Sequence, residues 1–584
     1  MAVLRLTLII ALFAILAGAV TIVATGHAGR ADWTTIGHDA ANSRNQPLER
    51  TIGRHNVDRL LPKWIAQTTG DVSGTPAVAD GALYFADFGG TLWKLDSETG
   101  QVIWSESVAE YTGHAGDYAR TSPSLAGNTL VIGVIKGTPA VPCGTDPSAC
   151  PNMLGVDART GALRWSARIH EDTRAAMTGS PVLVGDTVIT GISANGAGGA
   201  TSTFRGAIVA LSAQTGRILW RTYSVPALPQ ENGIPGYAGA TMFSPPAVNV
   251  DAGLVYGTFG QYYHAPASVT ACHAARDAAA GGFDESCEVA GAFWKSMVAF
   301  DLYTGKPRWS YRMNRSRGVC SMQPATVTWC APDDDGEKWD LGGSGANVMR
   351  IKMHRHGGDD ADDRENDRDA GDEHRDGRGH AGGPHGPWRD VVGIGAKSGV
   401  YTLLDAITGA HIWSTLIGPG GDQGGVEWGT AFDGKRIYVP ITNHHHIPYK
   451  LTENGVLDVA GPTITGGSWA ALDPVTGRIL WQTVDPQIET VPGFANVGVW
   501  DLAPVTVANG VVYAGSMAKL PSQHQFFALD AATGRILWRW SAGSSVNAAP
   551  AVVGGTVFWG SGYSRSGVEG SGNHQFFAFS VDGK

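Results

Sequence analysis

Hydrophobic and polar positions alternate along most of the chain, in short runs that glycine- and aspartate-rich turns separate. The stretch SGTPAVADGALYFADFGGTLWKLD, which begins at Ser73, holds two such runs on either side of an Asp-Gly pair. Alternation of this kind is typical of half-buried strands, and Asp-Gly between two runs indicates a tight hairpin. The pattern therefore predicts an all-β protein made of short antiparallel strands.

One strand–turn–strand unit repeats along the chain. ALDPVTGRILW at 471–481 and ALDAATGRILW at 528–538 are nearly identical, and looser copies end at Trp104, Trp165, Trp220, Trp309 and Trp413. In each copy, the Asp-x-x-Thr-Gly piece is suited to a tight turn, and a tryptophan stands at a fixed place in the next strand. Together with the hairpin upstream, one repeat makes about four antiparallel strands, which is the blade of a β-propeller.

The repeat count predicts eight blades over residues 32–584. The C-terminal stretch repeats the early strands of a blade but ends at Lys584 without a Gly-x-x-x-Trp segment. The missing strand is present near the N-terminus, in DRLLPKWIAQT at 58–68. We expect the N- and C-terminal strands to pair and close the last blade, because closure removes exposed strand edges. The repeated tryptophans are expected to pack between neighbouring blades.

Residues 354–387 break this pattern. The segment is rich in aspartate, arginine, glycine and histidine and has almost no apolar residue. Such a composition cannot bury a core, so it predicts a disordered, charged insertion between two strands. Binding of metal ions by its histidines is the alternative to a purely solvating insertion.

Charge and the N-terminus limit the partners and the compartment. The net charge of −10 comes without a basic stripe, which argues against nucleic acid as a partner. Residues 1–28 form an apolar run after Arg5 with small residues at its end, which predicts a secretory signal. An uncleaved membrane anchor is the alternative. We expect a periplasmic or secreted protein.

Six cysteines form three pairs that are close in sequence: 143 with 150, 272 with 287, and 320 with 330. In an exported chain, an even number of cysteines in local pairs favours three loop disulfides. The chain has no C-x-x-C-H, so no c-type haem is expected to be attached to it.

The repeated motif resembles the tryptophan-docking motif of quinoprotein alcohol dehydrogenases, which hold pyrroloquinoline quinone (PQQ) at the centre of an eight-bladed propeller. DWTTIGHDAANSRNQPLERTIGRHNVDRLLPKW, GAKSGVYTLLDAITG and GPGGDQGGVEWGTAFDGKRIYV are most similar to the polyvinyl alcohol dehydrogenase branch. The resemblance covers nearly the whole mature chain. It implies PQQ-dependent oxidation of a secondary alcohol or a polyvinyl-alcohol-like substrate, with electrons passed to a separate, soluble cytochrome c.

The resemblance also implies which residues bind the quinone. Arg120 in YARTSP matches an arginine near the quinone carboxylates, and Thr178 in MTGSP matches a hydrogen-bonding partner. Lys397 in GAKSG matches a lysine that donates to the reactive quinone oxygens, and Trp428 in EWG lies near the same funnel. Phe243 stands where the family has a tryptophan stacked under the quinone.

The calcium ligands of the family are only partly present. Gln261 stands where relatives have an asparagine ligand, and it offers a carbonyl oxygen to a hard cation. The glutamate expected after the strand DTVITGIS is missing, because residues 193–205 contain no carboxylate. Asn195 or the backbone could replace it, but a site short of carboxylates is expected to bind Ca²⁺ weakly.

The general base in relatives is an aspartate in a Trp-Asp context, and the resemblance implies Asp340 in EKWDLGGSGANV. Asp333, Asp334 and Asp335 are close alternatives for the base. The other alternative is that Asp340 lies on an exposed loop and has no catalytic role. The three histidines at 444–446 follow a predicted strand and could line the cleft or bind a metal.

A non-catalytic propeller that acts as a binding or scaffold protein of the cell envelope is the alternative function. Assembly lipoproteins of this type need a cysteine directly after the signal for a lipid anchor. The first cysteine here is Cys143, so no lipid anchor is expected. The missing glutamate is the feature that favours a propeller without a cofactor.

Overall fold

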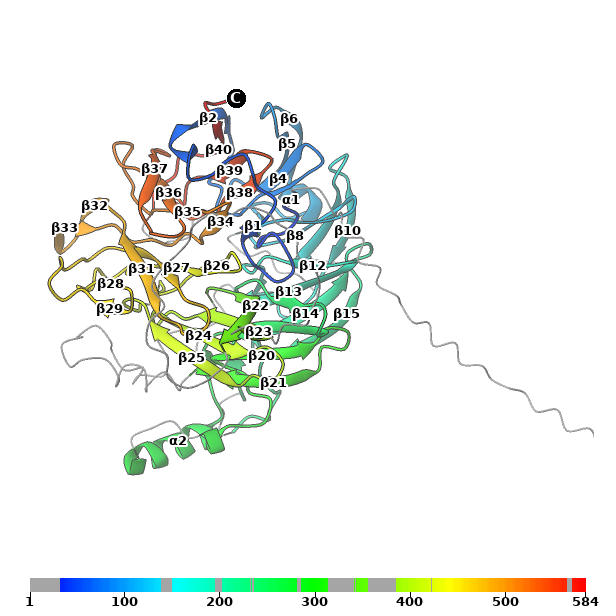
Figure 1. Cartoon of the computed structure of the whole chain (residues 1–584). Helices are drawn as coiled ribbons and strands as arrows, with labels where there is room; N and C mark the ends of the chain where they lie inside the picture. The colour runs from blue at the N-terminus through cyan, green and yellow to red at the C-terminus, as the bar shows by residue number, and fades with distance from the viewer. Residues whose placement is uncertain are drawn as a thin grey trace, which may run out of the picture.

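Strands of the chain form a closed ring of eight blades around a central axis (Figure 1), as the sequence predicts. The structure, a computed structural model, describes residues 32–137, 150–194, 202–231, 233, 236–280, 285–313, 341, 343–354, 385–421, 423–564 and 570–584. Each blade is a four-stranded antiparallel sheet, and the strands of a blade follow one another from the axis outward.

The first four blades have these strands. Blade 1 consists of β3 (Ala77–Ala79), β4 (Ala82–Ala86), β5 (Thr91–Asp96) and β6 (Val102–Ser107). Blade 2 consists of β7 (Ser124–Ala126), β8 (Thr129–Gly133), β9 (Met153–Asp157) and β10 (Leu163–Ala167). Blade 3 consists of β12 (Val182–Val184), β13 (Thr187–Ala194), β14 (Ala207–Ser212) and β15 (Ile218–Tyr223). Blade 4 consists of β17 (Ala247–Asn249), β18 (Leu254–Phe259), β20 (Ser296–Asp301) and β21 (Pro307–Arg312).

The last four blades complete the ring. Blade 5 consists of β22 (Ala346–His354), β23 (His385–Gly395), β24 (Val400–Asp405) and β25 (His411–Leu416). Blade 6 consists of β26 (Ala431–Phe432), β27 (Ile437–Ile441), β30 (Ser468–Leu472) and β31 (Ile479–Val484). Blade 7 consists of β34 (Thr506–Ala508), β35 (Val511–Gly515), β36 (Phe526–Asp530) and β37 (Ile536–Trp540). Blade 8 consists of β38 (Ala551–Val553), β39 (Thr556–Gly560), β40 (Gln575–Val581) and β2 (Leu60–Gln67).

Blade 8 joins the two ends of the chain. The N-terminal strand β2 pairs antiparallel with the C-terminal strand β40, and Trp64 lies opposite Ala578. This confirms the predicted closure of the last blade. The outermost strand of blade 8 thus comes from the start of the chain. Backbone hydrogen bonds between this strand and β40 close the ring.

The repeated tryptophans join each blade to the next. In every case the indole Nε1 donates a hydrogen bond to a backbone carbonyl of the following blade, over distances from 2.8 Å at Trp165 to 3.2 Å at Trp104 and Trp481. The donor–acceptor pairs are Trp64–Ser97, Trp104–Ala158, Trp165–Ala213, Trp220–Leu302, Trp309–Ala406, Trp413–Pro474, Trp481–Ala531 and Trp538–Leu60. The predicted packing between blades is therefore confirmed.

The Asp-x-x-Thr-Gly turn explains why the motif is so regular. Asp530 Oδ1 accepts hydrogen bonds from the backbone N–H of Ala532 at 2.8 Å and of Thr533 at 3.1 Å, which fixes the turn. Gly534 follows with a φ of 73°, and a Cβ there would lie only 2.5 Å from the ring of Trp481. Glycine is thus required twice, for the left-handed backbone and for the close approach of the preceding blade's indole.

The segment before β2 lies against the inner end of every blade. We call residues 33–46 the axial strap; it includes β1 (Asn45–Gln46), which pairs in parallel with β34. Figure 1 shows it in dark blue over the middle of the ring. Its hydrogen bonds reach the innermost strand, or the residue just before it, of blades 1 to 8 in order, through the pairs Trp33–Val78, Thr34–Leu125, Thr35–Pro181, Ala40–Val248, Ala41–Val348, Ser43–Phe432, Arg44–Val507 and Gln46–Val552.

Smaller elements decorate the ring. They are β11 (Ala175–Ala176), β16 (Ala238–Gly239), β19 (Tyr262–His264), β28 (Thr452–Glu453), β29 (Val456–Leu457), β32 (Ile488–Val491), β33 (Phe494–Gly498), α1 (Val108–Thr112), α2 (Ala267–Ala280) and short 3₁₀ turns at Val57–Arg59 and Glu285–Cys287. Helix α2 projects from the ring (Figure 1). Within the part of the chain that the structure describes, no helix has the length and apolar character needed to cross a membrane.

One predicted disulfide is present: Cys272 in α2 is bonded to Cys287. The predicted pairs 143–150 and 320–330 each include a cysteine outside the described residues, so they stay predictions. The predicted signal at 1–28 also lies outside them. The ladder of β22 and β23 reaches His354 and His385, at the edges of the predicted charged insertion, and residues 355–384 are not described.

Candidate functional site

A cavity lies on the propeller axis, between the axial strap and the turns that lead into the innermost strands. Most of its lining is small or polar, from turns such as Ser73-Gly74-Thr75, with a few large side chains among them. The lining residues are Ile36, Arg44, Ser73, Gly74, Thr75, Arg120, Ser122, Thr178, Ser180, Phe243, Pro245, Trp428, Pro504 and Asn547. Four of the predicted cofactor-binding residues are therefore brought to one cavity from four blades: Arg120, Thr178, Phe243 and Trp428.

Arg120 is held among aromatic rings. Its guanidinium lies 5.0 Å from the ring centre of Trp428, 5.7 Å from that of Tyr563 and 5.9 Å from that of Phe88. Its Nη2 donates a hydrogen bond of 2.9 Å to the hydroxyl of Tyr563. Cation–π contacts fix the direction of the guanidinium without neutralising its charge, so Arg120 can still pair with an anion.

Trp428 differs from the tryptophans between blades. Its backbone is left-handed, with a φ of 56°, and its ring meets that of Phe243 edge to face at 6.3 Å. Its Nε1 is buried and has no hydrogen-bond partner among the described residues. A left-handed backbone at a bulky residue is costly and persists only where the surroundings require it. A buried donor without a partner next to a cavity is suited to a ligand acceptor.

Lys397 approaches the same aromatic pair from blade 5. Its Nζ lies 5.5 Å from the ring centre of Phe243 and 3.4 Å from Oε1 of Glu427. Both side chains are mostly buried, with exposed fractions of 15% for Lys397 and 4% for Glu427. The carboxylate of Glu427 thus balances the charge of the Lys397 ammonium group and positions it next to the ring of Phe243.

Thr178 completes the predicted set at the cavity wall. Its hydroxyl forms a hydrogen bond of 2.7 Å with Ser193, and Ser193 donates to the carbonyl of Ala176 at 2.7 Å. The chain of hydroxyls fixes the orientation of Thr178 toward the cavity edge. The structure thus brings Arg120, Thr178, Phe243 and Trp428 into the lining and Lys397 beside it.

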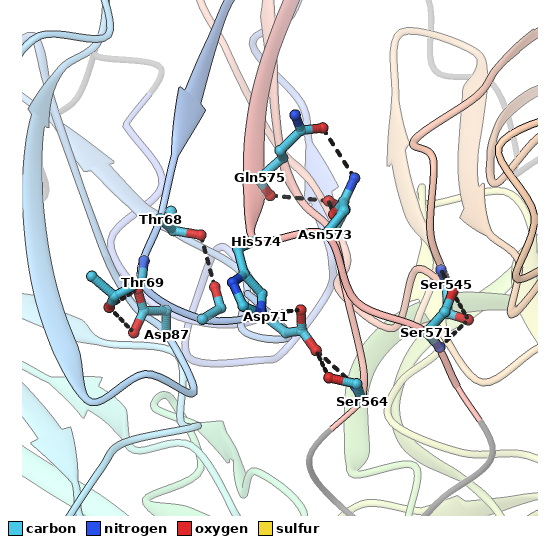
Figure 2. A network of polar contacts seen from close by, with 12 residues as sticks. Thr68, Thr69, Asp71, Asp87, Ser545, Ser564, Ser571, Asn573, His574 and Gln575 are labelled. Carbon is cyan, nitrogen blue, oxygen red and sulfur yellow. Dashed lines mark hydrogen bonds and ion pairs between the residues drawn. The ribbon is translucent and has the colours of Figure 1, made fainter.

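A polar network behind the cavity fixes the partner of Arg120. Figure 2 shows Asp71, which follows β2, and its contacts with the C-terminal strand region. Asp71 is 1% exposed and accepts hydrogen bonds from the backbone N–H and the hydroxyl of Ser564, at 2.7 and 2.6 Å. His574 lies 3.7 Å from its other oxygen. Because Ser564 adjoins Tyr563, this network holds the tyrosine whose hydroxyl accepts from Arg120.

Only one of the two predicted metal ligands, Gln261, lies among the described residues. Gln261 is half-buried between β18 and β19, where its backbone carbonyl accepts a hydrogen bond of 2.7 Å from the N–H of Ala240, and it is not among the residues lining the cavity. Asn195 lies outside the described residues. Among the described residues, no group of three or more histidine, cysteine, aspartate or glutamate side chains could hold a metal ion. Two of the histidines at 444–446 make contacts within the protein. His446 forms a hydrogen bond through Nδ1 with the carbonyl of Gly498, and the ring of His444 packs against that of Trp500.

The predicted base, Asp340, and its alternatives Asp333, Asp334 and Asp335 lie outside the described residues, so their roles stay predictions. Gly343, three residues after Asp340, reaches the site: its carbonyl accepts a hydrogen bond of 2.9 Å from the N–H of Trp428. Gly343 therefore lies beside the cavity.

Three functional side chains escape the sequence reasoning. Arg44 and Glu427 lie inside stretches that resemble the family, but nothing in the repeat pattern separates them from surface charges. Tyr563 is 2% exposed and belongs to the C-terminal blade, where the motif is incomplete. A signal for Glu427 does exist, because it directly precedes Trp428 in a glycine-rich turn, a context that is unusual for an exposed acid.

Comparisons with known proteins agree with this geometry. Residues 33–316 match the family described as glucose/ethanol/alcohol dehydrogenase, beta-propeller domain, and residues 465–584 match the family described as outer membrane protein assembly factor BamB. Polyvinylalcohol dehydrogenase of a Pseudomonas species is 26% identical, with 94% of this chain and 77% of the relative covered. Polyvinylalcohol dehydrogenase of Sphingopyxis sp. (strain 113P3) is also 26% identical, with 91% and 73% covered.

Among solved structures, the quinohemoprotein alcohol dehydrogenase of Comamonas testosteroni has the same fold. The superposition has a TM-score of 0.62 at 21% sequence identity and covers 95% of this chain and 81% of that one. The propeller fold, the partial match to the alcohol dehydrogenase propeller family and the relatives that align with nearly the whole chain agree: the chain is similar to quinoprotein alcohol dehydrogenases.

Proposed function

We propose that the protein is a PQQ-dependent alcohol dehydrogenase whose quinone binds in the axial cavity. The observation that carries the proposal is the convergence of Arg120, Phe243 and Trp428 on one cavity, with Lys397 beside it. These side chains come from separate blades, so only a ligand on the axis could contact them together.

The chemistry of the lining fits such a group. A flat, conjugated quinone that carries carboxylates needs aromatic faces, a cation and hydrogen-bond donors. Phe243 and Trp428 supply the aromatic surface, and Arg120 supplies a fork that can bind a carboxylate through two hydrogen bonds. The buried Nε1 of Trp428 and Oδ1 of Asn547, both without a partner among the described residues, offer a donor and an acceptor at the same wall.

The quinone, when bound, supplies the two-electron acceptor for the hydride of an alcohol. Arg120 orients a carboxylate, while Phe243 provides a face for the rings. Lys397 brings a positive charge to the same region, and its partner Glu427 keeps the ammonium group in place. The alcohol proton requires a general base, for which Asp340 is the predicted group. Among the described residues, no group of three or more histidine, cysteine, aspartate or glutamate side chains could hold a metal ion, and no step is assigned to calcium.

We infer the substrate class from the named relatives. Two of them are polyvinylalcohol dehydrogenases, which supports a secondary alcohol, free or along a polymer, as the substrate. A separate, soluble cytochrome c as electron acceptor and a periplasmic or secreted location belong to the same proposal. The absence of a C-x-x-C-H sequence supports a separate acceptor, because no haem can be attached to this chain by that motif.

The proposal is tested by adding PQQ with Ca²⁺ to the purified full chain. We expect saturable quinone binding, seen in absorbance, and oxidation of secondary alcohols coupled to an artificial dye. Arg120→Met in the same assay is expected to weaken quinone binding strongly. A protein that binds no quinone and oxidises no alcohol under these conditions would contradict the proposal. That outcome would favour the non-catalytic envelope propeller, which the match of residues 465–584 keeps as the second candidate.

A further inference from the structure

A second arginine lines the axial cavity from the side opposite the turns. Arg44 belongs to the axial strap, and its backbone carbonyl accepts a hydrogen bond of 2.9 Å from Val507 in blade 7. Its Nη2 donates to the carbonyl of Trp428 at 3.0 Å. Trp428 is therefore contacted by two guanidinium groups, that of Arg120 over its ring and that of Arg44 at its backbone.

Arg44 is buried without a counter-charge. Its exposed fraction is 0%, and its Nε and Nη1 are buried with no hydrogen-bond partner among the described residues. Burial lowers the pKa of Arg44 to about 9, and removal from water is the cause. A charge that is taken out of water without a partner is strongly unfavourable, so such groups normally pair with an ion or a ligand.

The cavity itself lacks the expected partner. Its lining contains two arginines and, among the described residues, neither aspartate nor glutamate. The protein as a whole has a net charge of −10, so a lining whose described charged residues are both arginines differs from the rest of the chain. A cavity lined by one sign of charge concentrates ligands of the opposite sign.

We propose that Arg44 is a further cofactor-binding residue, which binds a carboxylate of the quinone from the strap side of the cavity. This inference rests on the proposed function. Nη1 is buried without a hydrogen-bond partner among the described residues, and Nη2 uses one of its two N–H groups on Trp428. The Nη1–Nη2 end of the guanidinium can therefore bind a carboxylate through two parallel hydrogen bonds. The carboxylate supplies the missing counter-charge, and Arg44 and Arg120 then hold the same anionic ligand from two sides of Trp428.

A purely structural role would leave these features without a cause. The bond from Nη2 to the carbonyl of Trp428 uses one of the donors of Arg44, and a neutral side chain could fill the same space without the cost of burial. The close approach of Gly429, where a Cβ would lie 2.2 Å from Nε of Arg44, shows that the neighbouring backbone leaves room for this guanidinium.

The test compares Arg44→Met and Arg44→Lys with the wild type, all as full chains. Quinone affinity is measured by titration with PQQ, and the unfolding temperature is measured with and without PQQ. Arg54→Met is the matched control, because Arg54 lies in the same N-terminal region but is 60% exposed and pairs with Asp530 at 3.6 Å. We expect Arg44→Met to weaken quinone binding by roughly 10- to 100-fold, as for a lost charge-assisted hydrogen bond. Arg44→Lys is expected to lose less, and Arg54→Met nothing.

The increase in unfolding temperature on adding quinone distinguishes the possible roles. The inference predicts a smaller increase in Arg44→Met than in the wild type. An equal loss of stability with and without PQQ, at unchanged quinone affinity, would show that Arg44 is structural and would overturn it. The same measurement with sodium formate and sodium chloride distinguishes the source of the anion: stabilisation by these salts that depends on Arg44, together with unchanged quinone affinity, would also overturn the quinone assignment. If the wild type binds no PQQ at all, the proposed function fails first.

Discussion

The tryptophans between blades and the tryptophan on the axis use the same side chain in opposite ways. Trp481 is 5% exposed, donates its indole N–H to the carbonyl of Ala531 and lies against Gly534, and most of its counterparts pack on the motif glycine of the next blade in the same way. Trp428 has a left-handed backbone and a buried N–H without a partner among the described residues. The indole N–H of Trp481 has its hydrogen-bond acceptor within the chain, whereas that of Trp428 has none among the described residues and could donate to a ligand. Tryptophans whose N–H is hydrogen-bonded within the chain join the blades, and the tryptophan outside the repeat lines the cavity.

The largest effect is expected at a blade junction. Trp481→Ala removes a buried indole, its hydrogen bond and its packing on Gly534, so we expect a loss of ~3–5 kcal/mol in the free energy of unfolding. Denaturant unfolding measures this loss. The folded fraction should bind PQQ as the wild type does. A variant with normal stability but weak quinone binding would break the distinction between junction and cavity.

Arg120→Met is expected to have the converse effect. It removes the guanidinium that lies over Trp428 and donates to Tyr563, so we expect quinone affinity to fall by roughly 10- to 100-fold. The unfolding free energy without quinone should change by less than ~1 kcal/mol, since the side chain is only half-buried. Arg120→Lys serves as the control that keeps the charge. Equal quinone affinity in all three proteins would remove Arg120 from the site.

A buried carboxyl pair between blades 6 and 7 sharpens the comparison, because this junction is not purely apolar. Burial raises the pKa of Asp485 to about 6, and it raises the pKa of Asp501 well above its ordinary value, with Asp485 as a further cause. The folded protein therefore holds a proton on Asp485 more tightly than the unfolded chain does. This stabilisation is fully present below the ordinary pKa of 3.8 and is lost as the pH rises through about 6.

We accordingly expect the wild type to lose ~1–3 kcal/mol of unfolding free energy between about pH 4 and pH 7 from this pair. Asp485→Asn should make the pH profile flatter in that window, since amide and carboxylate can form a hydrogen bond without a shared proton. Unfolding in denaturant at a series of pH values gives both profiles. Identical slopes in the two proteins would show that Asp485 does not titrate in this window.

The smallest effect is expected at Trp428 itself. Trp428→Phe keeps an aromatic face beside Phe243 and Arg120 but removes the indole N–H that has no partner among the described residues. Since no bond within the chain is lost, the free energy of unfolding without quinone should change by less than ~1 kcal/mol. Quinone affinity should fall by up to roughly tenfold. A large loss of stability would place Trp428 with the structural tryptophans instead.

The fold could be predicted from the sequence because its main contacts are local and repeated. Asp530, Gly534 and Trp538 occur in one motif, and each copy of that motif has the same purpose, so spacing alone indicates the blades. The closure of blade 8 by the strand that contains Trp64 could be predicted because the C-terminal blade lacks one strand. The axial strap could not be predicted in this way, because its contacts reach all eight blades and leave no periodic trace in residues 33–46.

The site was only partly predictable for the same reason. Arg120, Phe243 and Lys397 were found through their resemblance to a family, not through any pattern of their own. In the sequence, nothing distinguishes Arg44 from a surface arginine. Only the folded ring places the axial strap, and with it Arg44, next to Trp428. Glu427 likewise gains a role only because Lys397 from the preceding blade lies 3.4 Å away. Convergence on an axis joins residues that are hundreds of positions apart, and no local signal records it.

The most direct test of the account is an experimental structure of the full chain crystallised with PQQ. The account predicts quinone density in the axial cavity, in contact with Phe243 and Trp428, with a carboxylate at the guanidinium of Arg120. Density for the quinone elsewhere, or an axial cavity that stays without quinone at a concentration that saturates binding in solution, would contradict it.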